Sequence, residues 1–373
     1  MYKRQIDPSL YFEDGRAFFI SNGTDCEGRG GVVQCEINIE TGEKLTESRC
    51  IWQGSGGRYL ESPHMYKIGK YYYLMAAEGG TEYGHMITYA RSESVWGKFE
   101  GYPHNPVLTN RNKAPFIIQG IGHGDLIQDK NGEWHIICLG FRQIHMWMTY
   151  HHLGRECFLI PVTFHEDGWF TAGNGTCEES YELSGDFAQL PLKTYTLENI
   201  GHDICHLRHP HTENYSITKD KITLKGTDVT LDDVASPTFA GVRQRDFDMD
   251  CSVSVSVSDG EGGLTVYSCE TEHYDLALRK NEGGYEAILR LNIGGIRHIE
   301  KAVQIPSGDA KLIIRSDSQV YKFFVQSQGE EIPMGFAMSK YLSSEVCGGF
   351  TGTVIGMYAV KGSAEFTDLR ISY

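Results

Sequence analysis

The first half of the chain repeats one pattern three times: an ionisable residue, a short strand, a glycine turn and a second strand of aromatic or aliphatic residues. The units open at Asp7, Glu61 and His123, which are 54 and 62 positions apart. A hairpin unit that recurs at such a spacing is typical of a β-propeller, whose blades repeat every ~40–50 residues or somewhat more. Because equivalent positions of successive blades are related by rotation about one axis, we expect these three side chains to converge on one pocket.

Further hairpin strands lie between the openers, for example residues 31–37 and 86–91, so each unit contains about four short strands. This is the strand content of a propeller blade. Three units are fewer than the ~4–8 blades that close a ring. We therefore expect two or more blades to lie upstream of Met1; the alternative is that a second chain supplies them.

The pattern changes near residue 195, where strands with strict apolar–polar alternation follow one another between Gly and Asp turns. They are residues 251–257, 264–267, 287–291, 311–315 and 320–325. Many short antiparallel strands at regular intervals indicate a β-sandwich or jelly roll. The sequence thus predicts an all-β chain with an incomplete β-propeller over residues 1–190 and a β-sandwich over residues 195–373.

The composition excludes some classes of partner. The net charge of −15 argues against nucleic acid, because phosphate binding needs a basic surface. No apolar run is long enough to cross a bilayer. Ten cysteines without a C-x-x-C pair or a zinc-like spacing favour a reducing compartment such as the cytoplasm. The first residues do not form a signal peptide. Because the chain starts within a blade, the presence of a signal peptide upstream of Met1 stays an open question.

Glu61 is the strongest candidate for a catalytic residue. It precedes Pro63 and has an aromatic surrounding that includes Tyr59, Tyr66 and residues 71–73. A poorly hydrated pocket raises the pKa of a carboxyl group, as a general acid near neutral pH requires. The alternative is a glutamate that caps a loop.

Three further residues are candidates with structural alternatives of their own. Asp7 precedes Pro8 and could tune the pKa of Glu61 by like-charge repulsion, or simply hold turn amides. His123, between two glycines, could bind a cation or a sugar hydroxyl, or be a satisfied structural residue. Arg142, which we expect just after the inner strand of the third unit, could form a fork onto vicinal hydroxyls or orient a carboxylate.

An ordered set of motifs along nearly the whole chain resembles one known family. The motifs are IDPSL at 6–10, ESPHMY at 61–66, YYYL at 71–74, AEGGT at 77–81, GHGDL at 122–126, LGRE at 153–156, LRHP at 207–210, ASPTF at 235–239 and FTG at 350–352. In this order they resemble glycoside hydrolase family 43, in the branch of β-xylosidases and α-L-arabinofuranosidases that carries a C-terminal, concanavalin A-like β-sandwich.

The resemblance implies a five-bladed propeller and an inverting mechanism without a required cofactor. Glu61 matches the general acid, and Asp7 matches the carboxylate that tunes and orients it. His123 and Arg142 match residues of the substrate pocket, and His123 lies near the place where Ca²⁺ or another cation is sometimes bound. Phe350 matches a sandwich loop that closes the pocket.

One part of the family pattern has no match. The family's general base is an Asp in the first blade, and no residue of this chain corresponds to it. Inversion needs a base that activates water on the face opposite the acid. We therefore expect an exo-glycosidase for terminal xylosyl or arabinofuranosyl units of small xylan-type oligosaccharides that is inactive, or nearly so, as this chain alone.

Two other hypotheses about the function remain at this point. The protein is a non-catalytic carbohydrate-binding protein, or it is a structural propeller used for protein contacts. The sequence predicts no nucleic-acid or membrane partner and leaves a homo-oligomer open.

Overall fold

The computed structural model describes residues 6–114, 116–144, 149–182 and 194–373, and these residues form an all-β chain. Their contacts divide the chain into two units. The first unit consists of Met1–Gln143 and Arg155–Phe187, and the second of Ile144–Gly154 and Ala188–Tyr373.

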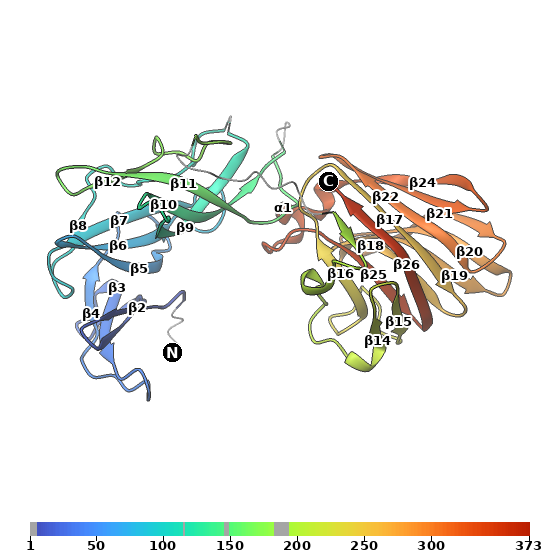
Figure 1. Cartoon of the computed structure of the whole chain (residues 1–373), viewed down its shortest axis with the longest axis horizontal. Helices are drawn as coiled ribbons and strands as arrows, with labels where there is room; N and C mark the ends of the chain where they lie inside the picture. The colour runs from blue at the N-terminus through green and yellow to red at the C-terminus, as the bar shows by residue number, and fades with distance from the viewer. Residues whose placement is uncertain (1–5, 115, 145–148, 183–193) are drawn as a thin grey trace. The chain divides into compact units, whose positions relative to one another are not determined.

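The first unit contains three four-stranded antiparallel sheets, each ordered as the strands follow in the chain (Figure 1). The first sheet contains β1 (Ser9–Glu13), β2 (Arg16–Thr24), β3 (Gly30–Ile37) and β4 (Arg49–Trp52). The second contains β5 (Glu61–Ile68), β6 (Tyr71–Glu78), β7 (Met86–Ser92) and β8 (Glu100–Gly101). The third contains β9 (Ile118–Gln128), β10 (Trp134–Arg142), β11 (Glu156–Phe164) and β12 (Phe170–Ala172). These meanders are the three blades that the sequence predicts.

Strand β6 shows how the blades stack. Its side chains alternate between the two faces of the sheet. Leu74 and Ala76 join a core with the first sheet, and Tyr73 and Met75 join a core with the third. Because both faces are buried, the strand is apolar almost throughout.

The second unit is a sandwich of two antiparallel sheets. The larger sheet contains β13 (Tyr195–Thr196), β14 (Tyr215–Ile217), β15 (Ile222–Gly226), β26 (Gly362–Ser372), β17 (Met249–Val257), β22 (Asp309–Ser316), β23 (Val320–Ser327) and β24 (Glu330–Met338). The smaller contains β16 (Thr238–Arg243), β25 (Val354–Val360), β18 (Glu261–Cys269), β19 (Glu272–Asn281), β20 (Gly284–Ile293) and β21 (Ile296–Ile305). The alternating strands predicted from the sequence lie within β17, β18, β20, β22 and β23, so the predicted sandwich is confirmed.

The core of the sandwich lies between the facing sides of its two sheets. Val253 and Val255 of β17 pack there with Leu276 and Leu278 of β19, and all four side chains are buried. The alternation of small polar and branched apolar residues in β17 follows from this, since only every second residue faces the core.

Helical structure is short in the described part of the chain. It consists of the 3₁₀ turns η1 (Gly201–Asp203), η2 (Thr212–Asn214) and η3 (Ser339–Leu342) and the single-turn helix α1 (Ser344–Cys347). No helix among the described residues is long and apolar enough to span a membrane.

The connection between β10 and β11 packs with the second unit. Within that unit the main chain of His151 accepts a hydrogen bond from the amide of Ser344 (3.0 Å), and the carbonyl of Leu153 accepts one from Arg243 (2.6 Å). A single cut in the sequence therefore does not separate the two units.

Candidate active site

Each blade of the first unit has a residue other than glycine with a positive φ angle in its first strand or just before that strand. These residues are Asp7, Ser62 and His123, with φ angles of 52°, 52° and 49°. Such angles are uncommon outside glycine, and three at equivalent positions indicate one recurring backbone turn. The prediction that Glu61 is the blade equivalent of Asp7 and His123 is therefore wrong by one position: Ser62 holds that place, and Glu61 precedes it. The charges of Asp7 and Glu61 favour the shifted register, whereas the Pro that follows both Asp7 and Ser62 marks the true one.

The side chains two residues further on link neighbouring blades. The Ser9 hydroxyl donates to the carbonyl of Pro63 (2.5 Å), and His64 Nδ1 lies 3.0 Å from Asp125 Oδ1. The Tyr66 hydroxyl also donates to Asp125 Oδ1 (2.6 Å). These bonds fix the openings of the three blades relative to one another.

Glu61 is the first residue of β5 and pairs with Ala77, beside an irregularity in the ladder. The side chain is half-buried and has no hydrogen bond or ion pair with any of the described residues. Burial raises the pKa of its carboxyl group, and the negative charge of Asp7 raises it further. Glu61 therefore keeps its proton to a higher pH than an ordinary glutamate does.

Asp7 and His123 face each other, with 3.9 Å between Asp7 Oδ2 and His123 Nδ1. Burial lowers the pKa of His123 more than the Asp7 carboxylate raises it. His123 is thus a neutral imidazole at neutral pH and can donate or accept a hydrogen bond.

His85 was not a candidate from the sequence, although it lies against this group. It is 4 % exposed, its Nδ1 lies 3.0 Å from the carbonyl of Gly120, and its ring covers Gly122 so closely that a Cβ there would lie 2.3 Å away. Burial lowers the pKa of His85 to about 4, although the Gly120 carbonyl opposes this shift. The sequence signal that could have revealed it is Gly122 itself, a strand glycine that admits a close neighbour. We call Asp7, Glu61, His64, His85, His123 and Asp125 the blade cluster.

Arg142 is the last residue of β10, the second strand of its sheet. Its guanidinium binds both oxygens of Glu156, with 2.9 Å from Nε to Oε2 and 2.9 Å from Nη2 to Oε1. Arg155 donates to the Thr81 hydroxyl (3.0 Å). The bidentate pair holds the Arg142 guanidinium in one orientation.

Glu78 is a second residue that the sequence did not single out. It is fully buried, and its carboxylate accepts hydrogen bonds from the amides of Ser55 (2.7 Å) and Gly57 (2.5 Å) and from the Thr88 hydroxyl (2.8 Å). Its role is to shape the loop that leads into β5.

Comparisons with known proteins identify the family of this chain. Residues 1–170 match the model of glycosyl hydrolases family 43, and residues 193–370 match that of the beta xylosidase C-terminal concanavalin A-like domain. A non-reducing end alpha-L-arabinofuranosidase of Bacteroides ovatus is 36% identical over 95% of this chain and 68% of its own length. The chain belongs to glycosyl hydrolase family 43.

Solved structures of the family support the fold. A Bacteroides ovatus protein described as GH43B of a xyloglucan PUL superposes with a TM-score of 0.89 at 35% identity, covering 99% of this chain and 76% of that one. A xylan beta-1,4-xylosidase from Bacillus halodurans gives a TM-score of 0.88 at 26% identity, over 99% of this chain and 76% of that one. The predicted architecture, a partial family 43 propeller followed by a concanavalin A-like sandwich, is confirmed.

Phe350, the pocket residue implied by the family resemblance, belongs to the second unit. It follows α1 and is 36% exposed, and its carbonyl lies against Gly154 of the same unit, where a Cβ would approach it to 2.7 Å. Its role towards a substrate stays a prediction.

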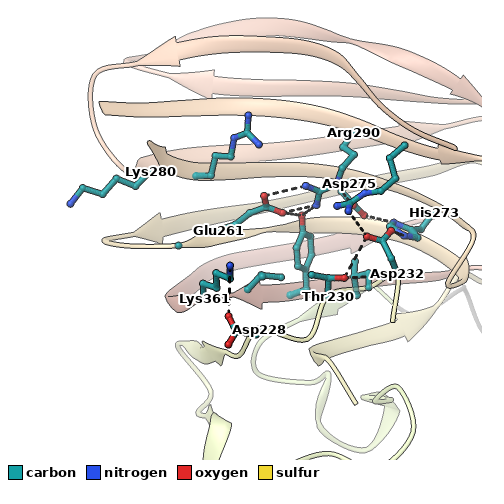
Figure 2. Close-up of a pocket in the computed structure, with 15 residues that line it drawn as sticks. Asp228, Thr230, Asp232, Glu261, His273, Asp275, Lys280, Arg290 and Lys361 are labelled. Atoms are coloured by element: carbon teal, nitrogen blue, oxygen red, sulfur yellow. Dashed lines mark hydrogen bonds and ion pairs between the residues drawn. The ribbon is translucent and has the colours of Figure 1, made fainter. Parts of the chain in front are cut away.

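The sandwich of this family 43 protein has a polar hollow of its own, of about 320 Å³. Figure 2 shows its side chains facing one another from β18, β19 and β20. Arg290 binds Asp275 (2.9 Å) and Glu261 (2.6 Å), and His273 lies between Asp275 (2.9 Å) and Asp232 (3.0 Å). We call these five residues the sandwich network.

The charged groups of the sandwich network pair with one another. Burial lowers the pKa of His273, but Asp275 and Asp232 outweigh this effect and raise it to about 9. Each carboxylate of the network contacts at least one cationic group. The hollow is therefore a structural ion cluster, and the blade cluster is the better candidate for chemistry.

Proposed function

We propose that the blade cluster is the acid half of an inverting exo-glycosidase site that acts on terminal xylosyl or arabinofuranosyl units of small oligosaccharides. The observation that carries the proposal is Glu61, a half-buried carboxyl group that has no counter-charge among the described residues and whose pKa is raised by burial and by Asp7. Those are the properties of a group that protonates a leaving oxygen. The names of the relatives, an arabinofuranosidase and a xylosidase/arabinosidase, support this class of substrate.

In this proposal each residue has one role. Glu61 donates the proton to the glycosidic oxygen, and the Asp7 carboxylate adds to the effect of burial in raising the pKa of Glu61. His123 and Arg142 bind hydroxyl groups: His123 as a neutral imidazole, and Arg142 through its guanidinium, which Glu156 holds in one orientation.

The reaction needs no cofactor in this proposal, because two carboxyl groups and water suffice for inversion. A cation near His123 would have one ring nitrogen and the Asp7 carboxylate as its ligands. Ca²⁺ takes 6–8 oxygen ligands. A cation beside His123 would therefore need most of its coordination from other groups, and its part would be structural.

We further propose that the described residues do not include the general base. The carboxylates near Glu61 already interact with other groups. Asp7 faces His123, and Asp125 is bound by His64 and Tyr66. Glu78 binds the loop before β5. Without activated water the protonated leaving group is not displaced, and this chain alone turns over aryl xylosides and aryl arabinofuranosides only at the background rate.

The experiment is an assay of the 373-residue chain with and without azide, which can replace activated water as nucleophile. We expect turnover only with azide, and a product of inverted anomeric configuration. Glu61→Gln should slow the reaction of phenyl glycosides far more than that of 2,4-dinitrophenyl glycosides, because only the poorer leaving group needs a proton. Glu27→Gln, at an exposed position of the first unit, serves as the control.

The outcomes separate the two parts of the proposal. Fast turnover without azide that Glu61→Gln abolishes would refute the missing base and retain the acid. An equal effect of Glu61→Gln on both leaving groups would refute the acid. Binding of xylo-oligosaccharides without any azide-dependent turnover would instead favour a carbohydrate-binding protein.

A further inference from the structure

Two cysteines and a glutamate that lie far apart in the sequence meet at one edge of the sandwich. Cys269 ends β18, Glu272 begins β19, and Cys347 is the last residue of α1. Their Sγ and carboxylate oxygen atoms lie within 4.8 Å of one another. No zinc-like spacing is visible in the sequence, because 78 residues separate Cys347 from Cys269 and only the fold joins them.

The carboxylate of Glu272 lacks a counter-charge. The residue is 5% exposed, and its Oε2 accepts hydrogen bonds from the Cys269 thiol (2.7 Å) and from the Thr271 hydroxyl. Its Oε1 accepts one from the amide of Gly294 (3.0 Å). No Lys, Arg or His among the described residues pairs with Glu272. A buried carboxylate without a cation is unfavourable, so the environment favours a positive charge at this place.

The thiols supply the ligand type that such a charge would need. Cys269 and Cys347 are both free and partly buried, and their sulfur atoms lie within 4.8 Å of each other. Thiolate sulfur selects borderline-soft ions such as Zn²⁺ over Ca²⁺ or Mg²⁺, and Zn²⁺ accepts a carboxylate oxygen as a further ligand. Two sulfurs, one carboxylate and an open fourth position match the coordination number of zinc.

We propose that Cys269, Glu272 and Cys347 form a Zn²⁺ site. Binding releases the two thiol protons to solvent and gives a four-coordinate ion with water in the fourth position; no oxidant or reductant takes part.

The site would fasten the segment that carries Phe350. One side of α1 is already bound to the 144–154 segment, because Glu345 accepts hydrogen bonds from the His151 amide (3.0 Å) and binds His151 Nδ1 (2.8 Å). Cys347 would tie the other side of α1 to the β18–β19 hairpin. An ion there would therefore order residues 344–352 from both sides.

The experiment is zinc titration of the full chain after removal of metal under reducing conditions. We expect one Zn²⁺ per chain by calorimetry and elemental analysis, and an observed binding enthalpy that changes linearly with the ionisation enthalpy of the buffer, because binding releases protons. Co²⁺ in place of Zn²⁺ should give the thiolate-to-cobalt absorption of a tetrahedral site.

Variants locate the ion. Cys269→Ser and Cys347→Ser should each weaken zinc binding by more than the ~10–100-fold that the loss of an outer-shell partner typically produces. Glu272→Gln should weaken it less, since a ligand oxygen remains. Cys157→Ser, which changes an exposed cysteine in the first unit, should leave zinc binding unchanged.

A measurement on the wild-type chain keeps the test independent of variant folding. Zinc should protect Cys269 and Cys347 from alkylation, while exposed Cys26 and Cys157 react at the same rate with or without it. It should also slow hydrogen exchange in residues 344–352. Equal alkylation with and without zinc, or unchanged affinity in Cys269→Ser, would overturn the proposal. So would a Cys269–Cys347 disulfide that, once reduced, yields a chain that binds no zinc.

Discussion

The blade cluster and the sandwich network contain the same kinds of groups and use them in opposite ways. In the sandwich network Asp275 is fully buried and bound by both His273 and Arg290. In the blade cluster Glu61 is half-buried and has no counter-charge among the described residues, and the negative charge of Asp7 raises its pKa further. A closed ion cluster stabilises a fold, whereas an under-compensated carboxyl group is left to interact with a ligand.

The backbone conformations of the blade cluster and the sandwich network also differ. Asp7, Ser62 and His123 have positive φ angles in or just before the first strand of their blades, whereas Glu261, Asp275 and Arg290 lie in strands and have no such angle. Strained residues persist only where the surrounding structure fixes them, and they gather at functional sites. Four substitutions test this contrast, and we expect the largest effect from the sandwich network and the smallest from the carboxylates of the blade cluster.

Arg290→Met should destabilise the sandwich by about 3–5 kcal/mol, because it leaves Asp275 and Glu261 as buried charges without their shared cation. Urea unfolding followed by hydrogen exchange of β18–β20 measures the loss. Lys361→Met removes the exposed pair with Asp228 (3.7 Å) and should change stability by no more than about 0.5 kcal/mol. Equal effects of the two changes would show that the sandwich network is not a closed ion cluster.

Gly122→Ala should destabilise the first unit by about 1–3 kcal/mol, because the new Cβ would lie 2.3 Å from the buried His85 ring. The control is Gly101→Ala, whose Cβ would come no closer than 3.7 Å to its neighbours and should be nearly neutral. Thermal unfolding of both variants tests the contact, and similar melting temperatures would contradict it.

Hairpin repeats were enough to predict three blades, and strict alternation was enough to predict the sandwich, because both patterns follow from which faces are buried. The candidate site could be predicted only in part. Asp7, Glu61 and His123 were found by their place before each hairpin, but the register of Glu61 was wrong by one residue. The side-chain charge of Glu61 suggests a register that begins there. The backbone conformation, which charge does not determine, places the register at Ser62 instead.

His85 and Glu78 were missed for a different reason. Each is defined by contacts with residues distant in the sequence: His85 with Gly120 and Gly122, and Glu78 with the loop at Ser55. The same holds for Cys269 and Cys347. A sequence motif identifies residues whose role depends on their spacing along the chain. The roles of His85, Glu78, Cys269 and Cys347 depend instead on contacts between strands that are distant in the sequence.

Glu61→Gln should leave the first unit as stable as the wild type or slightly more stable at neutral pH, by no more than about 1 kcal/mol, because solvent screens a half-exposed charge. The folded-state pKa of Glu61 is raised, so its ionised form disfavours folding above that pKa, and the effect disappears as the pH falls below the unfolded value. Glu156→Gln, which weakens the bond to Arg142, should destabilise instead. Urea unfolding at pH 7 and pH 4 distinguishes them, and a marked loss with Glu61→Gln would mean that Glu61 has a structural partner.

Asp7→Asn should lower the pKa of Glu61, because it removes the negative charge that raises it and leaves only burial to do so. Asn tolerates the left-handed conformation of Asp7, so the backbone should be retained. Titration of the Glu61 side-chain carbonyl carbon by NMR reads this pKa directly and does not depend on turnover. Asp14→Asn changes a carboxylate of the same hairpin that also has a left-handed backbone, with φ 50°, and should leave the Glu61 titration where it is. If both variants give the wild-type curve, Asp7 does not tune Glu61, and burial alone distinguishes this carboxyl group from the paired ones of the sandwich network.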